Sequence, residues 1–173
     1  QATYTITPDD QGKQIRAVVN YVDNQNNNES ISTVSSNIYF ISAGITASGG
    51  SGNDLLIGSN NYDTLQGLGG SDEIYGGDGN DIIEGGDGND TLYGEGDNDT
   101  ITGGAGVDVI YGGEGDDNLS DDGDSTIYGD AGNDTITGSN TYGLKVYGGD
   151  GNDVIQGKIF QTIDAGAGDD EVR

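Results

Sequence analysis

The 173-residue chain contains no cysteine, histidine, methionine or tryptophan, and a single proline. These absences exclude disulfides, Cys/His zinc sites and nucleophiles activated by histidine. Cations are also scarce, since five Lys and Arg stand against 31 Asp and Glu and give a formal net charge of −26. Such a charge repels nucleic-acid phosphates and anionic lipids. We therefore expect no nucleic-acid partner.

Long apolar runs are missing as well. No stretch approaches the roughly 18 apolar residues that a membrane span needs, so we expect no membrane insertion. The chain begins at Gln1 with neither an initiator methionine nor a signal-peptide pattern, so we expect it to be a piece of a longer protein. High net charge with few apolar residues is typical of disorder. The arrangement of the residues indicates otherwise.

The composition changes near Gly49. Residues 1–48 hold two of the 34 glycines, and residues 49–173 hold the other 32 together with most of the acidic residues. We therefore expect two units, 1–48 and 49–173.

From Gly49 the sequence repeats every nine residues, as in Gly76–Glu84 (GGDGNDIIE) and Gly85–Tyr93 (GGDGNDTLY). Fourteen units follow one another, the first eight without a slip and the last six with lengths of eight to ten. The penultimate position of every unit is aliphatic, which chance would not produce at 31% hydrophobic residues. These positions are Leu56, Leu65, Ile74, Ile83, Leu92, Ile101, Ile110, Leu119, Ile127, Ile136, Val146, Ile155, Ile163 and Val172.

One unit predicts its own local structure. The three residues around the aliphatic position form a short strand whose central side chain points inward. The six residues GGxGxD form a loop, because glycine reaches backbone angles closed to other residues. Two units then make one coil of 18 residues, and fourteen units predict seven stacked coils. The fold class expected is all-β, a parallel β-solenoid.

This pattern resembles the nonapeptide calcium-binding repeats of RTX (haemolysin-type) proteins, G-G-x-G-x-D-x-U-x. The resemblance implies a right-handed parallel β-roll in which each Ca²⁺ lies between the loops of units i and i+2, held by the loop aspartate and backbone carbonyls. Asp63 is a weaker candidate, because its loop, GSNNYD, lacks three of the glycines. The ligands implied are Asp54, Asp72, Asp81, Asp90, Asp99, Asp108, Asp117, Asp134, Asp153 and Asp170.

The loops differ between the two sides of the coil. On the side of the even-numbered units they keep the motif to the end. On the odd side three loops after the unit at Gly103 are too short or too long. We expect one long column of calcium ions and a second that stops early, about eight to ten Ca²⁺ in all. The alternative is that Asp and Gly only form turns.

Calcium is also expected to be needed for folding. Each unit offers one inward aliphatic side chain, whereas glycine-rich loops lose much conformational entropy and facing carboxylates repel. Bound metal supplies the missing stability.

A stripe of tyrosines ends the strands of five consecutive odd units. Two interpretations stay open: stabilisation across neighbouring strands, or a contact surface for self-association or a polysaccharide. The stripe comprises Tyr75, Tyr93, Tyr111, Tyr128 and Tyr147.

The first 48 residues have a different pattern. Residues 2–7 and 15–22 alternate apolar and polar side chains, and residues 30–41 predict a third strand. The stretch 4–30 resembles the carboxy-terminal half of bacterial Ig-like repeats, which implies a short antiparallel β segment. Three strands cannot close a sandwich of about seven. The segment is therefore truncated, completed by a partner, or recruited as a cap over the first coil.

The leading functional hypothesis is a calcium-binding structural module of a secreted or cell-surface bacterial RTX protein, of the adhesin or surface-layer type. The resemblance implies type I secretion and folding in external calcium. Two alternatives are a non-catalytic module of a secreted exoenzyme and a subunit of an extracellular filament. We expect no catalysis, because the spacing assigns the carboxylates to loops and no lysine follows the glycine runs as in phosphate-binding loops.

Overall fold

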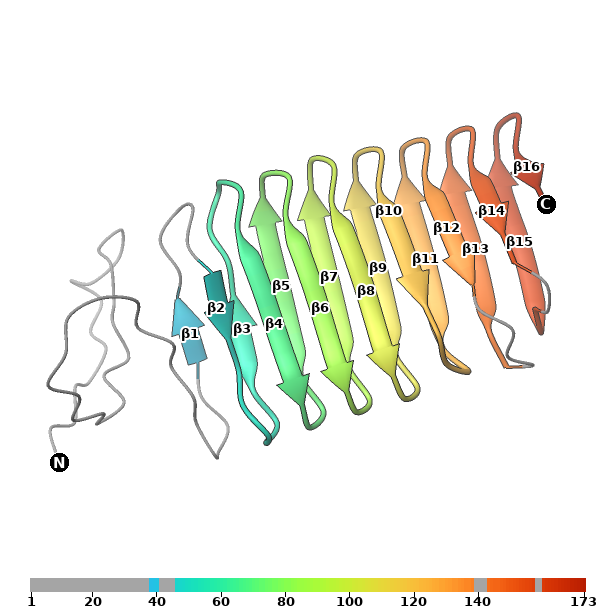
Figure 1. Ribbon diagram of the computed structural model, residues 1–173. Coiled ribbons are helices and arrows are strands. Elements are labelled where there is room, and N and C mark those ends of the chain that lie inside the picture. Colours follow the sequence, from blue (N-terminus) through green and yellow to red (C-terminus); the bar gives the residue numbers. More distant parts are fainter. Residues whose placement is uncertain (1–37, 41–45, 139–142, 158–159) are drawn as a thin grey trace, which may run out of the picture.

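The computed structural model describes residues 38–40, 46–138, 143–157 and 160–173, which form two layers of β-strands (Figure 1). Within these ranges no helix is long and apolar enough to cross a membrane. The first sheet contains, in spatial order, β1 (Ile38–Phe40), β3 (Leu55–Ile57), β5 (Glu73–Asp78), β7 (Thr91–Gly96), β9 (Val109–Glu114), β11 (Thr126–Ala131), β13 (Lys145–Asp150) and β15 (Thr162–Ala167). The second contains β2 (Thr46–Ser48), β4 (Thr64–Gly69), β6 (Ile82–Asp87), β8 (Thr100–Ala105), β10 (Asn118–Asp121), β12 (Thr135–Gly138), β14 (Val154–Gln156) and β16 (Glu171–Val172).

The chain alternates between the two sheets, and neighbouring strands of a sheet lie one coil apart in the sequence. All these pairs are parallel; β5 and β7, for example, pair Ile74 with Leu92. The predicted parallel β-solenoid of about seven coils of 18 residues is therefore confirmed. The irregular units keep the register, since Tyr111 pairs with Tyr128 and Tyr128 with Tyr147.

The strands are longer than the expected three residues. Strand β5 covers six residues and includes the first three of the following loop. Its last residues, Gly77 and Asp78, still pair with Glu95 and Gly96 of β7. Stacked loops of equal length keep their backbones aligned, so parallel pairing continues into the glycines and leaves a short turn.

The core consists of aliphatic side chains that both sheets contribute to the space between them. The first twelve aliphatics of the penultimate row, from Leu56 to Ile155, all have no exposed surface. Ile163 and Val172 belong to the last coil, where 37% and 51% of the side chain is exposed. Each coil therefore buries its aliphatic pair mainly against the coils before and after it, as in other solenoids.

The glycines of the loop serve two different needs. Gly86 and Gly88 have φ of 112° and 143°, in the region that favours glycine. Gly85 has no such angle, but a Cβ atom there would lie 2.5 Å from both the Oδ2 atom of Asp90 and the carbonyl oxygen of Gly103. Close approach requires glycine at the first position. A positive φ favours glycine at the second and fourth positions, although Glu95 and Asp97 adopt φ of 78° and 68° there. The third position, here Asp87, has neither constraint.

The solenoid sheets begin before Gly49. Strands β1 and β2 pair in parallel with β3 and β4. Of the strand expected over residues 30–41, only Ile38–Phe40 is described, and its pairing is parallel rather than antiparallel. The strands expected at 2–7 and 15–22, and with them the Ig-like resemblance, lie outside the described residues. The division between 1–48 and 49–173 stays a prediction.

Candidate metal sites in the turns

The loop aspartates form two ladders, one at each edge of the solenoid. In each ladder, Oδ1 accepts a hydrogen bond from the backbone N–H of the aspartate one coil earlier. The short ladder has N–O distances of 2.8 Å and contains Asp54, Asp72, Asp90 and Asp108. The long ladder has distances of 2.7–2.9 Å and contains Asp63, Asp81, Asp99, Asp117, Asp134, Asp153 and Asp170.

In most of these aspartates the second carboxylate oxygen has no donor, whereas Oδ2 of Asp54 accepts the N–H of Gly50 at 2.6 Å and Oδ2 of Asp63 accepts from Ser59. Burying a polar atom unpaired is costly, so a recurrent row of such atoms fits a cation-binding site. Among the described residues, the buried side-chain oxygens with no hydrogen-bond partner are Oδ1 of Asp63 and Oδ2 of Asp72, Asp81, Asp90, Asp99, Asp108, Asp117, Asp121, Asp134 and Asp153.

A backbone carbonyl oxygen faces each of these carboxylates in the regular coils. Beside Gly76, the position of an added Cβ lies 2.6 Å from Asp81 Oδ2 and 2.8 Å from the carbonyl oxygen of Gly94. Hard, anionic and carbonyl oxygens converging in a flexible loop suit Ca²⁺. In the described part of the chain, no group of three or more acidic side chains is arranged to hold a metal ion by itself. The backbone would therefore supply much of the coordination shell.

Burial makes the ladder carboxylates hard to ionise without a cation. Loss of solvent raises the pKa of Asp99 to about 8 and that of Asp134 to about 7. The same effect raises the pKa of Asp72, Asp81 and Asp117 to about 6. The N–H bond of the ladder opposes the shift, and neighbouring carboxylates add to it. A divalent cation would favour the ionised form.

The structure places all ten aspartates implied by the resemblance in the two ladders, Asp170 at the half-buried end. Their binding of metal stays a prediction. Asp63, the weaker candidate, belongs to the same ladder and is fully buried. Its loop keeps Gly58, the glycine required by close approach: a Cβ there would lie 3.1 Å from Asp63 Oδ2. Ser59 then donates its N–H and hydroxyl to Asp63 Oδ2, at 2.7 and 2.9 Å.

The carboxylates of the short ladder end at Asp108. The N–H of Asp108 donates to the hydroxyl of the buried Ser125 at 2.7 Å. One coil further, the same position holds Leu144, which has no exposed surface and joins the apolar core, with Phe160 packed against that core. In the odd-numbered loops that lack the motif, the ladder position is thus occupied first by the hydroxyl of Ser125 and then by the hydrocarbon side chain of Leu144.

Asp121 is a buried acid that the motif did not predict. It stands at the first position of its unit, where the regular units have glycine, and only 3% of it is exposed. Its Oδ1 accepts the N–H of Gly123 at 2.5 Å. Burial raises the pKa of both Asp121 and Asp108, the latter to about 7 with a contribution from Asp121. An acid in a glycine position was the signal available in the sequence.

A third ladder runs along the outside of the turns, formed by the residue before most of the ladder aspartates. Asn89 Oδ1 accepts the N–H of Val107 at 3.0 Å, and Asn133 Oδ1 accepts that of Asn152 at 2.9 Å. These bonds come from the following coil, whereas the aspartates accept from the preceding one. Sequence reasoning missed this role, since asparagine is common in any turn.

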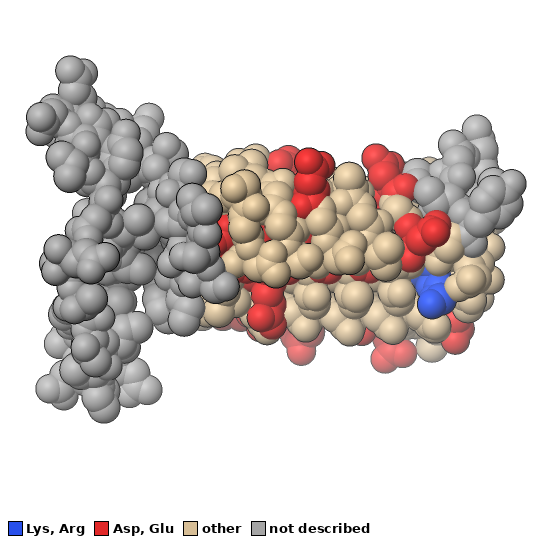
Figure 2. All heavy atoms as spheres, turned by 90° about the horizontal axis from the view of Figure 1, so that it is seen from below, with Lys and Arg blue, Asp and Glu red and all other residues tan. Residues whose placement is uncertain are grey.

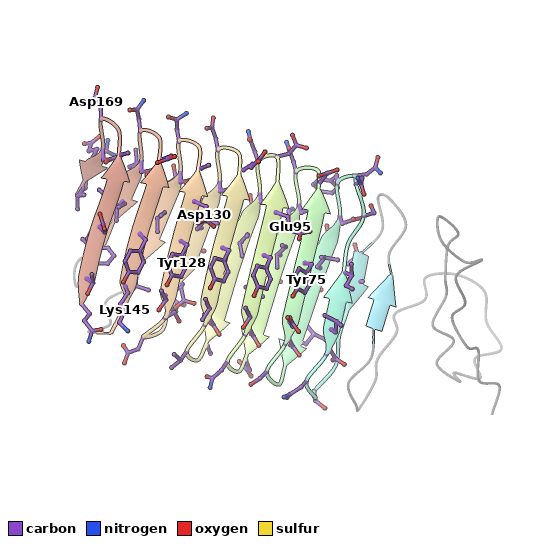
Figure 3. All side chains as sticks on the ribbon, turned by 180° about the vertical axis from the view of Figure 1, so that it is seen from behind. Tyr75, Glu95, Tyr128, Asp130, Lys145 and Asp169 are labelled. Carbon is purple, nitrogen blue, oxygen red and sulfur yellow. The ribbon has the colours of Figure 1, made fainter. Side chains whose placement is uncertain are left out.

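The tyrosine stripe is present on the outer face of the first sheet (Figure 3). Consecutive rings from Tyr75 to Tyr147 have centroids 4.6–5.0 Å apart and planes within 3–10° of each other. This is an offset-stacked arrangement, which stabilises aromatic pairs. Tyr75 also donates its hydroxyl to Glu73 at 2.6 Å, a bond that raises the Tyr75 pKa to about 12.

The surface is acidic along the solenoid. In Figure 2, Asp and Glu side chains are spread over the described part, and Lys or Arg is visible only toward one end. Arg173 pairs with Glu171. Such a field raises the local concentration of cations near the turns.

Fold and site together define a calcium-binding type of β-roll: parallel coils whose turns carry rows of buried, unpaired carboxylate oxygens beside backbone carbonyls. The RTX calcium-binding nonapeptide repeat model matches four times, over residues 48–83, 84–119, 120–140 and 145–158. These matches cover more than half of the chain, which belongs to this family. Comparisons with curated proteins and with solved structures give no match. RTX repeats bind Ca²⁺ and are typical of secreted bacterial proteins.

Proposed function

We propose that the chain is a calcium-folded structural module of a secreted or cell-surface bacterial RTX protein, of the adhesin or surface-layer type, with right-handed coils. One observation supports this above all: the repeated buried carboxylate oxygen without a donor, beside a backbone carbonyl. A fold that needs so many unpaired anions in its interior is stable only when cations neutralise them.

The same feature links the module to its place of action. Calcium that binds only the folded roll stabilises it by mass action. A chain secreted into calcium-rich surroundings would stay unfolded inside the cell and fold outside. We propose about eight to ten Ca²⁺ per chain, held by the ten aspartates and by backbone carbonyls.

A calcium titration of the chelator-stripped chain, followed by far-UV circular dichroism with Mg²⁺ as the control ion, tests this proposal. The expected result is a cooperative gain of β-structure with Ca²⁺ alone, since Mg²⁺ requires a tighter octahedral shell. A chain fully folded without metal at neutral pH would overturn the mechanism.

One loop provides a matched pair of variants. Asp90→Asn keeps an oxygen that can accept the ladder hydrogen bond from the N–H of Asp72 and removes the buried charge, so the calcium midpoint should rise several-fold. Asp87→Asn removes the same charge from an exposed position of the same loop and should leave the midpoint near its original value. Equal shifts would mean that only net charge matters.

We also propose that the chain itself has no catalytic activity, because its buried carboxylates are committed to the ladders. Two other architectures remain as alternatives. A catalytic domain elsewhere in the full-length protein would favour the exoenzyme module. Calcium-dependent polymerisation, measured by sedimentation, would favour the filament subunit.

The tyrosine stripe is a candidate contact surface for self-association or a polysaccharide, in addition to its stabilising role. Its five stacked rings form a continuous, partly exposed aromatic row, and such rows often mark interfaces. Sedimentation velocity of the calcium-loaded chain with and without polysaccharide tests both contacts. Tyr111→Ser should weaken whichever contact is found.

A further inference from the structure

The break in the short ladder contains an oxygen pair unlike those of the regular coils. In a regular coil, the Oδ2 atom of Asp90 and the carbonyl oxygen of Gly103 both lie 2.5 Å from the point where a Cβ of Gly85 would stand. One coil later, beside Gly103, the carboxylate oxygen of Asp108 meets Oδ2 of Asp121 instead. Asp121 is the residue one coil after Gly103. Its side chain therefore replaces a neutral carbonyl oxygen with an anionic one.

Both carboxylates are buried and held in orientation. Asp108 has no exposed surface, and 3% of Asp121 is exposed. The N–H of Asp90 fixes Oδ1 of Asp108, at 2.8 Å, and the N–H of Gly123 fixes Oδ1 of Asp121, at 2.5 Å. Neither Oδ2 atom has a well-oriented hydrogen-bond donor, although a side-chain hydrogen bond with Ser125 lowers the pKa of Asp121. Two converging anionic oxygens without a partner are more costly than the single one of a regular coil.

We propose that Asp108 and Asp121 together bind one Ca²⁺, at a site in which Asp121 is a ligand that the nonapeptide motif does not include. The two Oδ2 atoms lie within 2.7 Å of the point where a Cβ of Gly103 would stand, so they are at most about 5 Å apart. Calcium–oxygen distances of about 2.3–2.6 Å allow a single ion to contact both. Two carboxylates also balance the charge of one divalent cation.

This site rests on the proposed calcium-dependent function and makes it more specific. Affinity for Ca²⁺ rises with the number of charged ligands. The pair should therefore bind more tightly than the regular sites of the short ladder, which offer one carboxylate and one carbonyl at this corner. The proposed ion would be the last one along the short ladder, because Ser125 and Leu144 occupy the aspartate position in the next two coils.

Equilibrium dialysis of the full chain with radioactive calcium tests the site. Asp121→Asn should bind one ion fewer than the unchanged chain at a free calcium concentration that saturates the latter. Asp122→Asn removes the same charge from the adjacent, exposed residue and should bind the full number. Circular dichroism at saturating calcium checks that each variant is folded.

Asp121→Gly is the second variant, in case a buried amide prevents folding. It restores the residue that regular units carry, so the calcium affinity of this corner should fall to that of a regular site of the short ladder. Equal numbers and affinities for Asp121→Asn and Asp122→Asn would overturn the site and indicate a proton shared by the two carboxyls. Failure of the unchanged chain to bind calcium would overturn the proposed function as well, so the two failures are distinguishable.

Discussion

The backbone N–H of Asp99 donates to the Oδ1 atom of Asp117 at 2.8 Å, across one full coil. Most ladder aspartates, with Asp99 and Asp117 among them, therefore have two functions at once. One oxygen joins its coil to the preceding one, and the other faces the position proposed for calcium. Metal binding and coil stacking are thereby coupled in one side chain, which predicts cooperative folding along the ladder.

Substitution of the first glycine of a loop should disturb the site directly. Gly67→Ala would place a methyl group against Asp72 Oδ2 and the carbonyl oxygen of Gly85, which costs about 1–3 kcal/mol for an overpacked position. Gly69→Ala, in the same loop, meets nothing closer than 3.8 Å and has no strained backbone angle. Urea unfolding in saturating calcium should separate the two variants. Equal stability would show that the loop yields freely.

The central aliphatic row should carry much of the stability of the calcium-loaded roll. Ile101 has no exposed surface, so Ile101→Ala should lower the free energy of unfolding by about 2–5 kcal/mol. Ile163→Ala, in the last coil where 37% of the side chain is exposed, should cost clearly less. Urea titrations in saturating calcium measure both. A larger loss at Ile163 would contradict a core formed by stacked neighbouring coils.

The stability of the metal-free fold should increase as the pH is lowered, whereas most acidic proteins lose stability at low pH. Folding raises the pKa of Asp99 to about 8 and that of Asp134 to about 7, so the folded state binds protons more tightly than the unfolded state. Its stability is therefore highest at low pH and falls as pH rises through about 6–8. Far-UV circular dichroism of the stripped chain should show β-structure increasing as pH falls from about 8 to about 5. A signal independent of pH would contradict the buried, protonated ladder.

Calcium reverses this dependence, because protons and calcium compete for the same oxygens. The calcium midpoint should accordingly rise as the pH is lowered. A midpoint unchanged between neutral and mildly acidic buffer would argue against ligation by the raised carboxylates.

Loss of one ring should weaken the tyrosine stripe on both sides. Tyr111 stacks on Tyr93 and on Tyr128, with centroid distances of 5.0 and 4.9 Å. Each such pair is worth about 0.5–1.5 kcal/mol beyond its buried area, so Tyr111→Ala should cost about twice as much in stacking as Tyr147→Ala, which loses one pair. Unfolding in saturating calcium, followed by circular dichroism, gives the comparison. Equal losses would mean that stacking contributes little.

The repeating part of the structure was predictable because its signal is periodic. The aliphatic positions and the tyrosine spacing both follow from the alternation of side chains along a strand and from the length of a coil. The strand pairing is kept across the short and long units, so both patterns continue there. Strand length was not predictable. Continued pairing at Gly77 and Asp78 depends on the neighbouring coil rather than on local preference.

The individual sites were predictable only where the motif is regular. Asp63 looked weaker because glycines are missing from its loop, yet the glycine that close packing requires, Gly58, is retained. Asp121 escaped notice because a single acid in a glycine position carries no periodic signal. Its inward orientation depends on the hydrogen bond that it accepts from the N–H of Gly123 and on the absence of a side chain at Gly103.

The replacement of Asp108 by Ser125 and then Leu144 gives the two edges of the solenoid different dependence on calcium. When calcium is withdrawn, the long ladder loses its counter-ions along its whole length, whereas the edge around Leu144 keeps its hydrocarbon contacts. Disassembly would then be asymmetric, with one seam opening while the opposite one holds the last coils together. The edge around Leu144 would then serve as a template on which the neighbouring coils refold when calcium is added again.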